Sequence, residues 1–268
     1  MSDLLKGKRG LIMGVANDMS MAWSIAKLCA ENGAEIAMPY GIPQLEKRVV
    51  PLAESIGAKF VMETNVQNDA QMDALFARIE KEWGGLDFVL HAVAFSDKNE
   101  LVGRFVDTSR DNFKNTMDIS VYSFADVARR AAPLMKNGGS ILTLTYLGGE
   151  KSVPNYNVMG VAKAALDSAT RYLAADLGKD NIRVNAISAG PIRTLAASGI
   201  GGFRDMLDLN AMLTPMRRNM TLEDVSGAAL YMFSELSSGV TGEIHHVDCG
   251  YSSTALVPAE VQSMILKK

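Results

Sequence analysis

The sequence predicts an α/β fold: a single-domain Rossmann-like doubly wound sheet of about seven parallel strands with helices on both faces. Short apolar segments alternate with segments of helical length along all 268 residues, which is typical of βαβ units. Right-handed crossovers between parallel strands then give the doubly wound arrangement. An apolar share of 48%, with no internal repeat and no linker, favours one domain over residues 1–268.

Seven segments are expected to form strands, because each is short, apolar and bounded by glycine or polar residues. They cover residues 9–14, 35–38, 59–62, 86–91, 140–145, 182–187 and 243–247. In a parallel sheet the carboxyl ends of the strands share one edge, where ligands bind. We therefore expect the strand-end residues Gly14, His91, Thr145 and Ala189 to rim one cleft.

Helices are expected between these strands, each with an apolar stripe or a glycine stop. They cover residues 22–32, 44–56, 69–83, about 110–135, about 154–177 and 222–233. Pro154 suits a first helical turn, where its missing N–H costs no hydrogen bond. A segment rich in Gly, Ala and Met, about 189–214, is expected to be a loop.

Composition excludes several classes of function. The net charge of −3 and the lack of a basic tract exclude nucleic-acid binding, and no apolar run is long enough to span a membrane. Two isolated cysteines, Cys29 and Cys249, favour a reducing cytoplasmic location. His245 and His246 are adjacent and would face opposite sides of a strand, so no metal site is expected.

The main candidate for chemistry is the pair Tyr156 and Lys163. Residues seven apart on a helix face the same way, so both side chains should point into one site. An ammonium group near a phenol lowers the phenol's pKa, which would make Tyr156 an acid or an oxyanion stabiliser. The alternative is that both are ordinary helix residues.

The first strand–helix turn is a candidate phosphate site, because backbone N–H groups at a helix N-terminus bind anions. Only Gly14 remains of the usual glycine motif, and Ser20 precedes the helix, where it could cap the helix or donate to a phosphate. The alternative is a plain turn and cap. After the second strand, residues 38–44 hold neither a carboxylate for NADH nor an arginine for the 2′-phosphate of NADPH, which leaves the choice between the two open.

Four segments carry a resemblance to a known family: residues 14–20, 145–148, 154–163 and 183–199. On these motifs the chain resembles the short-chain dehydrogenase/reductase superfamily and, within it, bacterial enoyl-acyl-carrier-protein reductases, over nearly its whole length. The ketoreductases of the superfamily carry Tyr and Lys four apart, and no tyrosine here has a lysine at that spacing. The spacing of seven is that of the enoyl reductases.

The resemblance implies that a nicotinamide cofactor, NADH with NADPH not excluded, transfers hydride to C3 of a trans-2-enoyl thioester. Tyr156 would stabilise the enolate oxygen, Lys163 would bind the nicotinamide ribose, and Tyr146 would line the acyl pocket. A tyrosine packed in the core is the alternative for Tyr146.

The same resemblance implies further contacts. Those to the cofactor are expected at Gly14, Ser20, Met21, Gly41, Asn65, Val66, Val93, Lys163, Ile192, Arg193, Thr194, Leu195 and Ala196. Those to the substrate are expected at Ser96, Tyr146, Tyr156, Met159, Ile200, Phe203 and Met206. Residues 192–214 would form a lid over the substrate, against the alternative of a helix packed permanently in the core. The chain departs from the family pattern at Gly41, Asn65 and Ala94, where Gln, Asp and Gly are usual.

The implied partners are an acyl carrier protein that carries the enoyl chain and, in a homotetramer, three further copies of this chain. Arg193, Arg217 and Arg218 are candidates to meet the acidic carrier protein. Two other functions stay open. One is a related reductase of a different enone or carbonyl substrate, and the other is a non-catalytic dinucleotide-binding regulator.

Overall fold

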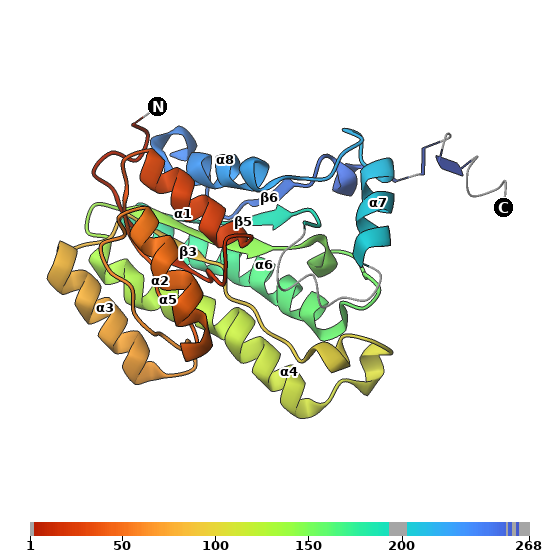
Figure 1. The fold of residues 1–268 in the computed structure, drawn as a ribbon, viewed down its shortest axis with the longest axis horizontal. Helices are drawn as coiled ribbons and strands as arrows, with labels where there is room; N and C mark the ends of the chain where they lie inside the picture. Colours follow the sequence, from red (N-terminus) through yellow and green to blue (C-terminus); the bar gives the residue numbers. More distant parts are fainter. Residues whose placement is uncertain (1–2, 193–202, 256, 259–260, 263–268) are drawn as a thin grey trace.

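The computed structural model describes residues 3–192, 203–255, 257–258 and 261–262. Its centre is a parallel sheet with helices on both faces (Figure 1). The strands are β1 (Arg9–Met13), β2 (Glu35–Ala37), β3 (Phe88–His91), β4 (Gly139–Thr145), β5 (Ile182–Ala189) and β6 (Ile244–Val247), in the order β2-β1-β3-β4-β5-β6. Every neighbouring pair is parallel, which confirms the predicted fold class.

The described sheet has six strands, whereas seven were predicted. The predicted strand at residues 59–62 lies along the outer edge of β2, where it forms only two isolated bridges, Ala37↔Phe60 and Tyr40↔Glu63. Backbone hydrogen bonds accompany them, from Met38 N to Phe60 O (3.1 Å) and from Tyr40 N to Met62 O (3.0 Å). This segment is therefore an irregular edge of the sheet, and the predicted location was right although the regular strand is absent.

The helices are α1 (Met21–Glu31), α2 (Glu46–Ser55), α3 (Asp69–Trp83), α4 (Arg110–Met117), α5 (Ser123–Ala131), α6 (Asn157–Leu177), α7 (Phe203–Leu213) and α8 (Leu222–Phe233). Two buried clusters fill the space between helices and sheet. One joins α1, α2 and α8 to one face, and the other joins α3, α5 and α6 to the opposite face.

Three predicted helix boundaries are wrong. The long helix of residues 110–135 is broken by a π-helical turn, Asp118–Tyr122, between α4 and α5. α7 occupies part of the predicted loop. α6 begins at Asn157 instead of Pro154, because Asn155 adopts a left-handed φ of 60°, which a helix does not accept.

The strand ends meet at one edge, as predicted. Met13 pairs with His91, and Thr145 pairs with Ser188. Gly14 leaves β1 with a φ of +98°, and a Cβ at this position would lie 2.0 Å from the carbonyl oxygen of Ala92. Only glycine allows the chain to turn this close to the end of β3.

His91 at the end of β3 is completely buried. Its Nε2 lies 2.8 Å from Ser123 Oγ, and its Nδ1 lies 3.3 Å from Thr143 Oγ1. The Ser123 hydroxyl donates to Ile119 O (2.6 Å), so it can accept from His91 in the tautomer that carries the proton on Nε2. Burial, aided by the charge of Lys163, lowers the pKa of His91 to about 3, which keeps the folded imidazole neutral.

This neutral histidine predicts an acid-sensitive stability. Below its unfolded pKa of about 6.5 the unfolded chain takes up a proton that the folded chain does not. The free energy of unfolding therefore decreases as the pH decreases, by up to ~1.4 kcal/mol per pH unit from this residue. Chemical denaturation at about pH 7.5 and about pH 5.5 should give a smaller loss for His91→Gln than for the wild type. Equal losses would show that His91 is not held neutral by the fold.

Candidate active site

The two tyrosines of the predicted site come from adjacent elements at the end of β4. Tyr146 follows β4 directly and precedes the short turn Leu147–Gly149, and Tyr156 immediately precedes α6. Their ring centroids are 5.0 Å apart at an interplanar angle of 71°, an edge-to-face contact. The structure thus brings together the two side chains that the sequence singled out.

Gly148 makes this pairing possible. A Cβ at this position would lie 2.5 Å from Cδ1 of Tyr156 and 3.1 Å from Cδ1 of Tyr146. The backbone of the turn therefore packs directly on both rings. Sequence analysis did not identify Gly148 as a site residue, because a glycine pair after a strand signals only a turn.

Lys163 lies on α6 two turns after Tyr156 and is 7% exposed. Its Nζ donates to Leu144 O at 2.7 Å, which directs the amine to the end of β4. Burial lowers the pKa of Lys163 to about 8, against an opposing effect of Asp167.

The predicted lowering of the pKa of Tyr156 is wrong. Burial raises the pKa of this phenol, and the nearby Tyr146 and Asp167 raise it further. Because desolvation disfavours a phenolate, Tyr156 is a neutral hydrogen-bond donor at pH 7. It can stabilise an oxyanion by donation without giving up its proton in advance.

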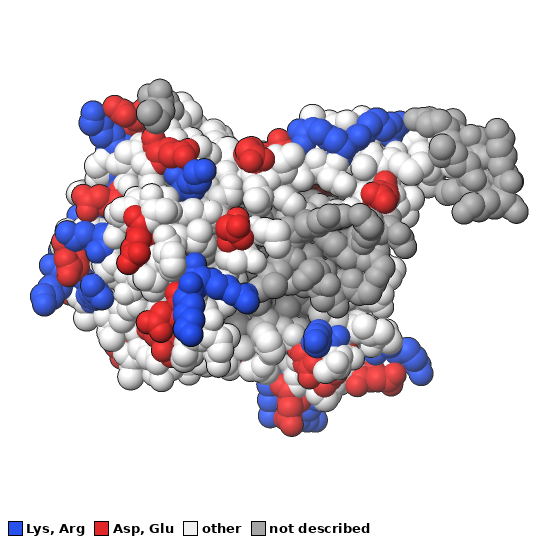
Figure 2. Space-filling view, viewed as in Figure 1, with Lys and Arg blue, Asp and Glu red and all other residues white. Residues whose placement is uncertain are grey.

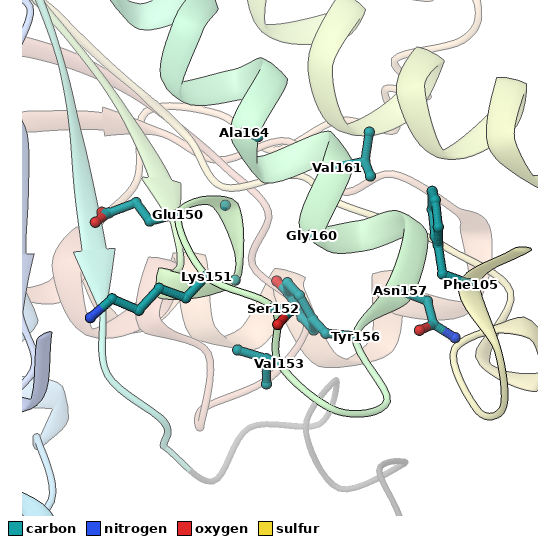
Figure 3. Close-up of a pocket in the computed structure, with 12 residues that line it drawn as sticks. Phe105, Glu150, Lys151, Ser152, Val153, Tyr156, Asn157, Gly160, Val161 and Ala164 are labelled. Atoms are coloured by element: carbon teal, nitrogen blue, oxygen red, sulfur yellow. The ribbon is translucent and has the colours of Figure 1, made fainter. Parts of the chain in front are cut away.

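A cavity of about 390 Å³ opens beside Tyr156. Figure 3 shows that its wall is formed by the start of α6, the turn after β4, and a separate loop that carries Phe105. Its lining is Phe105, Gly148, Gly149, Glu150, Lys151, Ser152, Val153, Tyr156, Asn157, Gly160, Val161 and Ala164. Met159, a predicted substrate contact, is buried instead and does not line this cavity.

The first strand–helix turn differs from the prediction in one respect. Ser20 is the N-cap residue of α1, but its side chain does not cap the helix. Its Oγ accepts from the N–H groups of Ala16 and Asn17, both at 3.1 Å, and donates to Asn17 Oδ1. The hydroxyl therefore shapes the loop after Gly14, and the first N–H groups of α1 are left available for an anion.

The adenosine end of the predicted cofactor site is open at Gly41, since no atom lies within 4 Å of a Cβ built there. Asn65 is held by the loop around it. Its N–H donates to Gln71 Oε1 (2.7 Å), and its Oδ1 accepts from Gln67 N (3.0 Å). Its neighbour Val66 packs on the second cluster. This arrangement presents a shallow, open surface at the tip of β2.

The loop after β3, which carries Val93 and Ser96, is held by hydrogen bonds to α4 and to the π-helical turn. The Ser120 hydroxyl lies 3.1 Å from Phe95 N and 3.3 Å from Phe95 O, and Asn112 Oδ1 accepts from Asp97 N (3.0 Å). Ser96 Oγ accepts from Thr116 Oγ1 (3.0 Å), so this predicted substrate contact is engaged within the protein.

Asn112, Thr116, Ser120 and Ser123 form one buried polar stripe along α4, the π-helical turn and the start of α5. Their spacing of four, four and three residues is the signal that sequence analysis missed.

The other predicted residues are placed as follows. Met21 is the first residue of α1, and Ile192 packs against the first cluster. Phe203 and Met206 belong to α7, but their side chains lie outside the described part of the structure. Arg193, Thr194, Leu195, Ala196 and Ile200 lie outside the described residues. Within the described ranges no group of His, Cys, Asp or Glu side chains could hold a metal ion.

Comparisons with known proteins match this chain to enoyl-acyl-carrier-protein reductases. Residues 14–252 match the family model described as "Enoyl-(Acyl carrier protein) reductase". The chain is 58% identical, over 267 residues, to "Enoyl-[acyl-carrier-protein] reductase [NADH] 1" of Rhizobium meliloti, covering 100% of this chain and 98% of that protein.

Solved structures of enoyl-acyl-carrier-protein reductases also resemble this chain. The crystal structure of the enoyl-acyl-carrier-protein reductase of Anaplasma phagocytophilum in complex with NAD has a TM-score of 0.93 at 57% identity, covering 97% of this chain and 99% of that one. The enzyme of Bacillus cereus, with NADP+ and indole naphthyridinone, also has a TM-score of 0.93, at 48% identity, covering 96% and 100%.

The contact of Gly148 with both tyrosine rings predicts a local cost of adding a side chain. Gly148→Ala should lower the free energy of unfolding by about 1–3 kcal/mol through overpacking and change the near-ultraviolet circular dichroism of the rings. Gly178→Ala, at the other end of α6 with helical backbone angles and no atom within 4 Å of its Cβ, is the matched control and should not lower the stability or change the spectrum. A Gly148→Ala protein as stable as the control would contradict this packing.

Proposed function

The chain belongs to the enoyl-acyl-carrier-protein reductase family, and on that basis we propose that it reduces the C2=C3 double bond of trans-2-enoyl-acyl-carrier-protein thioesters, the last step of the fatty-acid elongation cycle. The observation that carries this proposal is the neutral phenol of Tyr156 at the N-terminus of the helix that carries the buried, basic Lys163. This arrangement suits stabilisation of an oxyanion more than abstraction of a proton.

The nicotinamide cofactor supplies the hydride when bound. As hydride reaches C3 of the substrate, negative charge moves to the thioester oxygen. Tyr156 donates a hydrogen bond to that oxygen, where charge develops. Its raised pKa keeps it protonated until this moment. A proton from solvent then adds to C2 of the enolate to give the saturated thioester. The edge of Tyr146 fixes the ring of Tyr156 and excludes water from one side.

NADH is the proposed cofactor. Lys163 Nζ has two donors beyond its bond to Leu144 O, which suit the two ribose hydroxyls. The Gly14 turn and the open N-terminus of α1 suit the pyrophosphate. The relative from Rhizobium meliloti is named for NADH, whereas the Bacillus cereus structure holds NADP+, so the assay below compares both cofactors.

Two other functions are supported less well by the site. A reductase of another enone or carbonyl substrate would share the Tyr156–Lys163 site. A non-catalytic dinucleotide-binding regulator would need neither residue. The relative from Rhizobium meliloti is named for an enoyl-acyl-carrier-protein substrate, which favours a fatty-acyl thioester over a small polar substrate.

The assay for this function follows NADH or NADPH oxidation at about 340 nm with a trans-2-enoyl thioester. Wild type should oxidise NADH, and Tyr156→Phe, which lacks only the donated hydrogen bond, should lower kcat by about 10²–10³-fold. Unchanged turnover in Tyr156→Phe would remove the phenol from the mechanism. Failure of the wild type to oxidise either cofactor, in protein that binds NADH, would favour one of the two weaker functions.

We also propose that one domain, residues 1–268, carries the site, with residues 192–214 as the substrate lid. The acyl carrier protein would dock where the chain passes from α7 to α8. Figure 2 shows basic side chains along this edge, and the sequence between α7 and α8 supplies Arg217 and Arg218. Arg218 there pairs with Asp224, and Arg217 donates to Met212 O and Thr214 O.

The proposed location is the cytoplasm, in line with two buried cysteines that form no disulfide. No helix among the described residues is long and apolar enough to cross a membrane.

A homotetramer is proposed on the exposed face of α6. Val161 and Tyr172 on this face are 38% and 73% exposed, and small residues such as Ala164 between them allow a second helix to approach closely. Large exposed apolar groups of this kind mark interaction surfaces.

Light scattering tests the assembly. The wild type should have about four times the 28.9 kDa chain mass, and Tyr172→Glu should dissociate it because a carboxylate would be desolvated in the interface. Leu236→Glu, at an apolar residue 66% exposed in the turn after α8, should keep the wild-type mass. A wild-type monomer, or a Tyr172→Glu protein of unchanged mass, would contradict this interface.

A further inference from the structure

Asp167 is a buried carboxyl group that the mechanism above does not use. It follows Lys163 by four residues on α6, so the two side chains lie on the same face of the helix one turn apart. Asp167 is 5% exposed and Lys163 is 7% exposed. A buried carboxyl group costs free energy unless a charge or a donor compensates it, so its place beside the site requires a reason.

The turn after β4 closes over this carboxyl group. A Cβ at Gly149 would lie 2.8 Å from Asp167 Oδ2 and 2.9 Å from the backbone nitrogen of Ala164. The same turn carries Gly148, which packs on Tyr156. Asp167 therefore lies beneath the segment that positions the two tyrosines.

The hydrogen bonds of Asp167 and Lys163 leave an acceptor unused on the first residue and donors unused on the second. Among the described residues, Asp167 Oδ1 and Thr145 Oγ1 are buried and have no hydrogen-bond partner. Lys163 has three donors and uses one, to Leu144 O. Asp167 Oδ1 is therefore an open acceptor on the same helix face as an ammonium group that has donors to spare.

Few charged groups lie near Asp167 and Lys163. Burial raises the pKa of Asp167, and Glu150 in the turn after β4 raises it further, whereas Lys163 and Arg171 on α6 lower it and so favour the carboxylate. His91 on β3, which faces Lys163, is neutral. Asp167 is the group that raises the pKa of Lys163 against the effect of burial.

We propose that Asp167 is a positioning residue of this site, whose carboxylate keeps the buried Lys163 amine charged and directed to the end of β4. A charged Lys163 donates to the ribose hydroxyls and holds a positive field near the developing enolate. The identity of those ligands rests on the proposed function, but the effect of Asp167 on Lys163 does not.

The test is the titration of Lys163 in the full-length protein without ligand. Lysine labelled with ¹³C at Cε gives one signal per residue, and the signal of Lys163 is identified by its loss in Lys163→Met. In the wild type it should titrate near pH 8. Asp167→Asn, which keeps the shape and removes the charge, should lower this midpoint by about one pH unit, and Asp167→Glu should restore it. An unchanged midpoint in Asp167→Asn would overturn the proposal.

NADH affinity gives a second readout. Because binding needs the charged amine, the affinity should fall above the Lys163 midpoint, and in Asp167→Asn the fall should begin about one pH unit lower. The same pH profile for both proteins would also overturn the proposal, since a purely structural role of Asp167 would change affinity equally at every pH.

If Asp167→Asn does not fold, the titration of the wild-type protein still tests the proposal. The Lys163 signal should then show a second, smaller inflection at acidic pH, where Asp167 takes up its proton, and a flat curve there would overturn the proposal. The titration requires no substrate. A shifted midpoint in a protein that reduces no enoyl thioester would therefore refute only the proposed function, and an unshifted midpoint in an active enzyme would refute only this inference.

Discussion

The direct packing of the turn after β4 on the start of α6 is the contact on which the site depends. Gly148 brings backbone against the rings of Tyr146 and Tyr156, and Gly149 brings it against Asp167. Without side chains at these two positions, the turn packs closely on the ring of Tyr156 and on the part of α6 that carries Asp167. Burial raises the pKa of Tyr156 and lowers that of Lys163, so the packing around this turn affects the protonation of both groups.

A second set of contacts fixes the opposite side of the site. The polar stripe formed by Asn112, Thr116, Ser120 and Ser123 binds the loop after β3 and the His91 ring from within the core. The π-helical turn between α4 and α5 adjusts the helical register, so that Ser120 reaches Phe95 while Ser123 reaches His91. π-Helical turns often occur at functional sites. Both walls of the site are therefore built from ordered backbone, which favours a preorganised electrostatic environment.

Much of the fold could be predicted from the sequence, because hydrophobic periodicity and glycine stops are local signals. α3 and α8 have the predicted boundaries, and the strand ends meet as expected. The irregular edge at residues 59–62 could not be predicted, since an outer segment looks like any short apolar run until its neighbours are known. The start of α6 was missed because two asparagines, Asn155 and Asn157, adopt positive φ values, which only the surrounding contacts can impose.

For the site, the spacing of Tyr156 and Lys163 predicted two residues on one helix, which α6 and its N-cap provide, but it did not predict their electrostatics. The sequence places an ammonium seven residues from a phenol, and only the structure shows that burial, with Tyr146 and Asp167 nearby, raises the pKa of the phenol. Asp167 and Gly148 were missed for the same reason: their roles come from what packs on them.

The most direct test of this account is the position of the transferred hydride in the product. Protein, a trans-2-enoyl thioester and NADH carrying deuterium at the transferred C4 position are incubated, and the product is examined by mass spectrometry and NMR. The account predicts one deuterium at C3 of a saturated acyl thioester, with the thioester carbonyl intact. Deuterium on a carbon that bears a hydroxyl group, or no deuterium in the product, would contradict it.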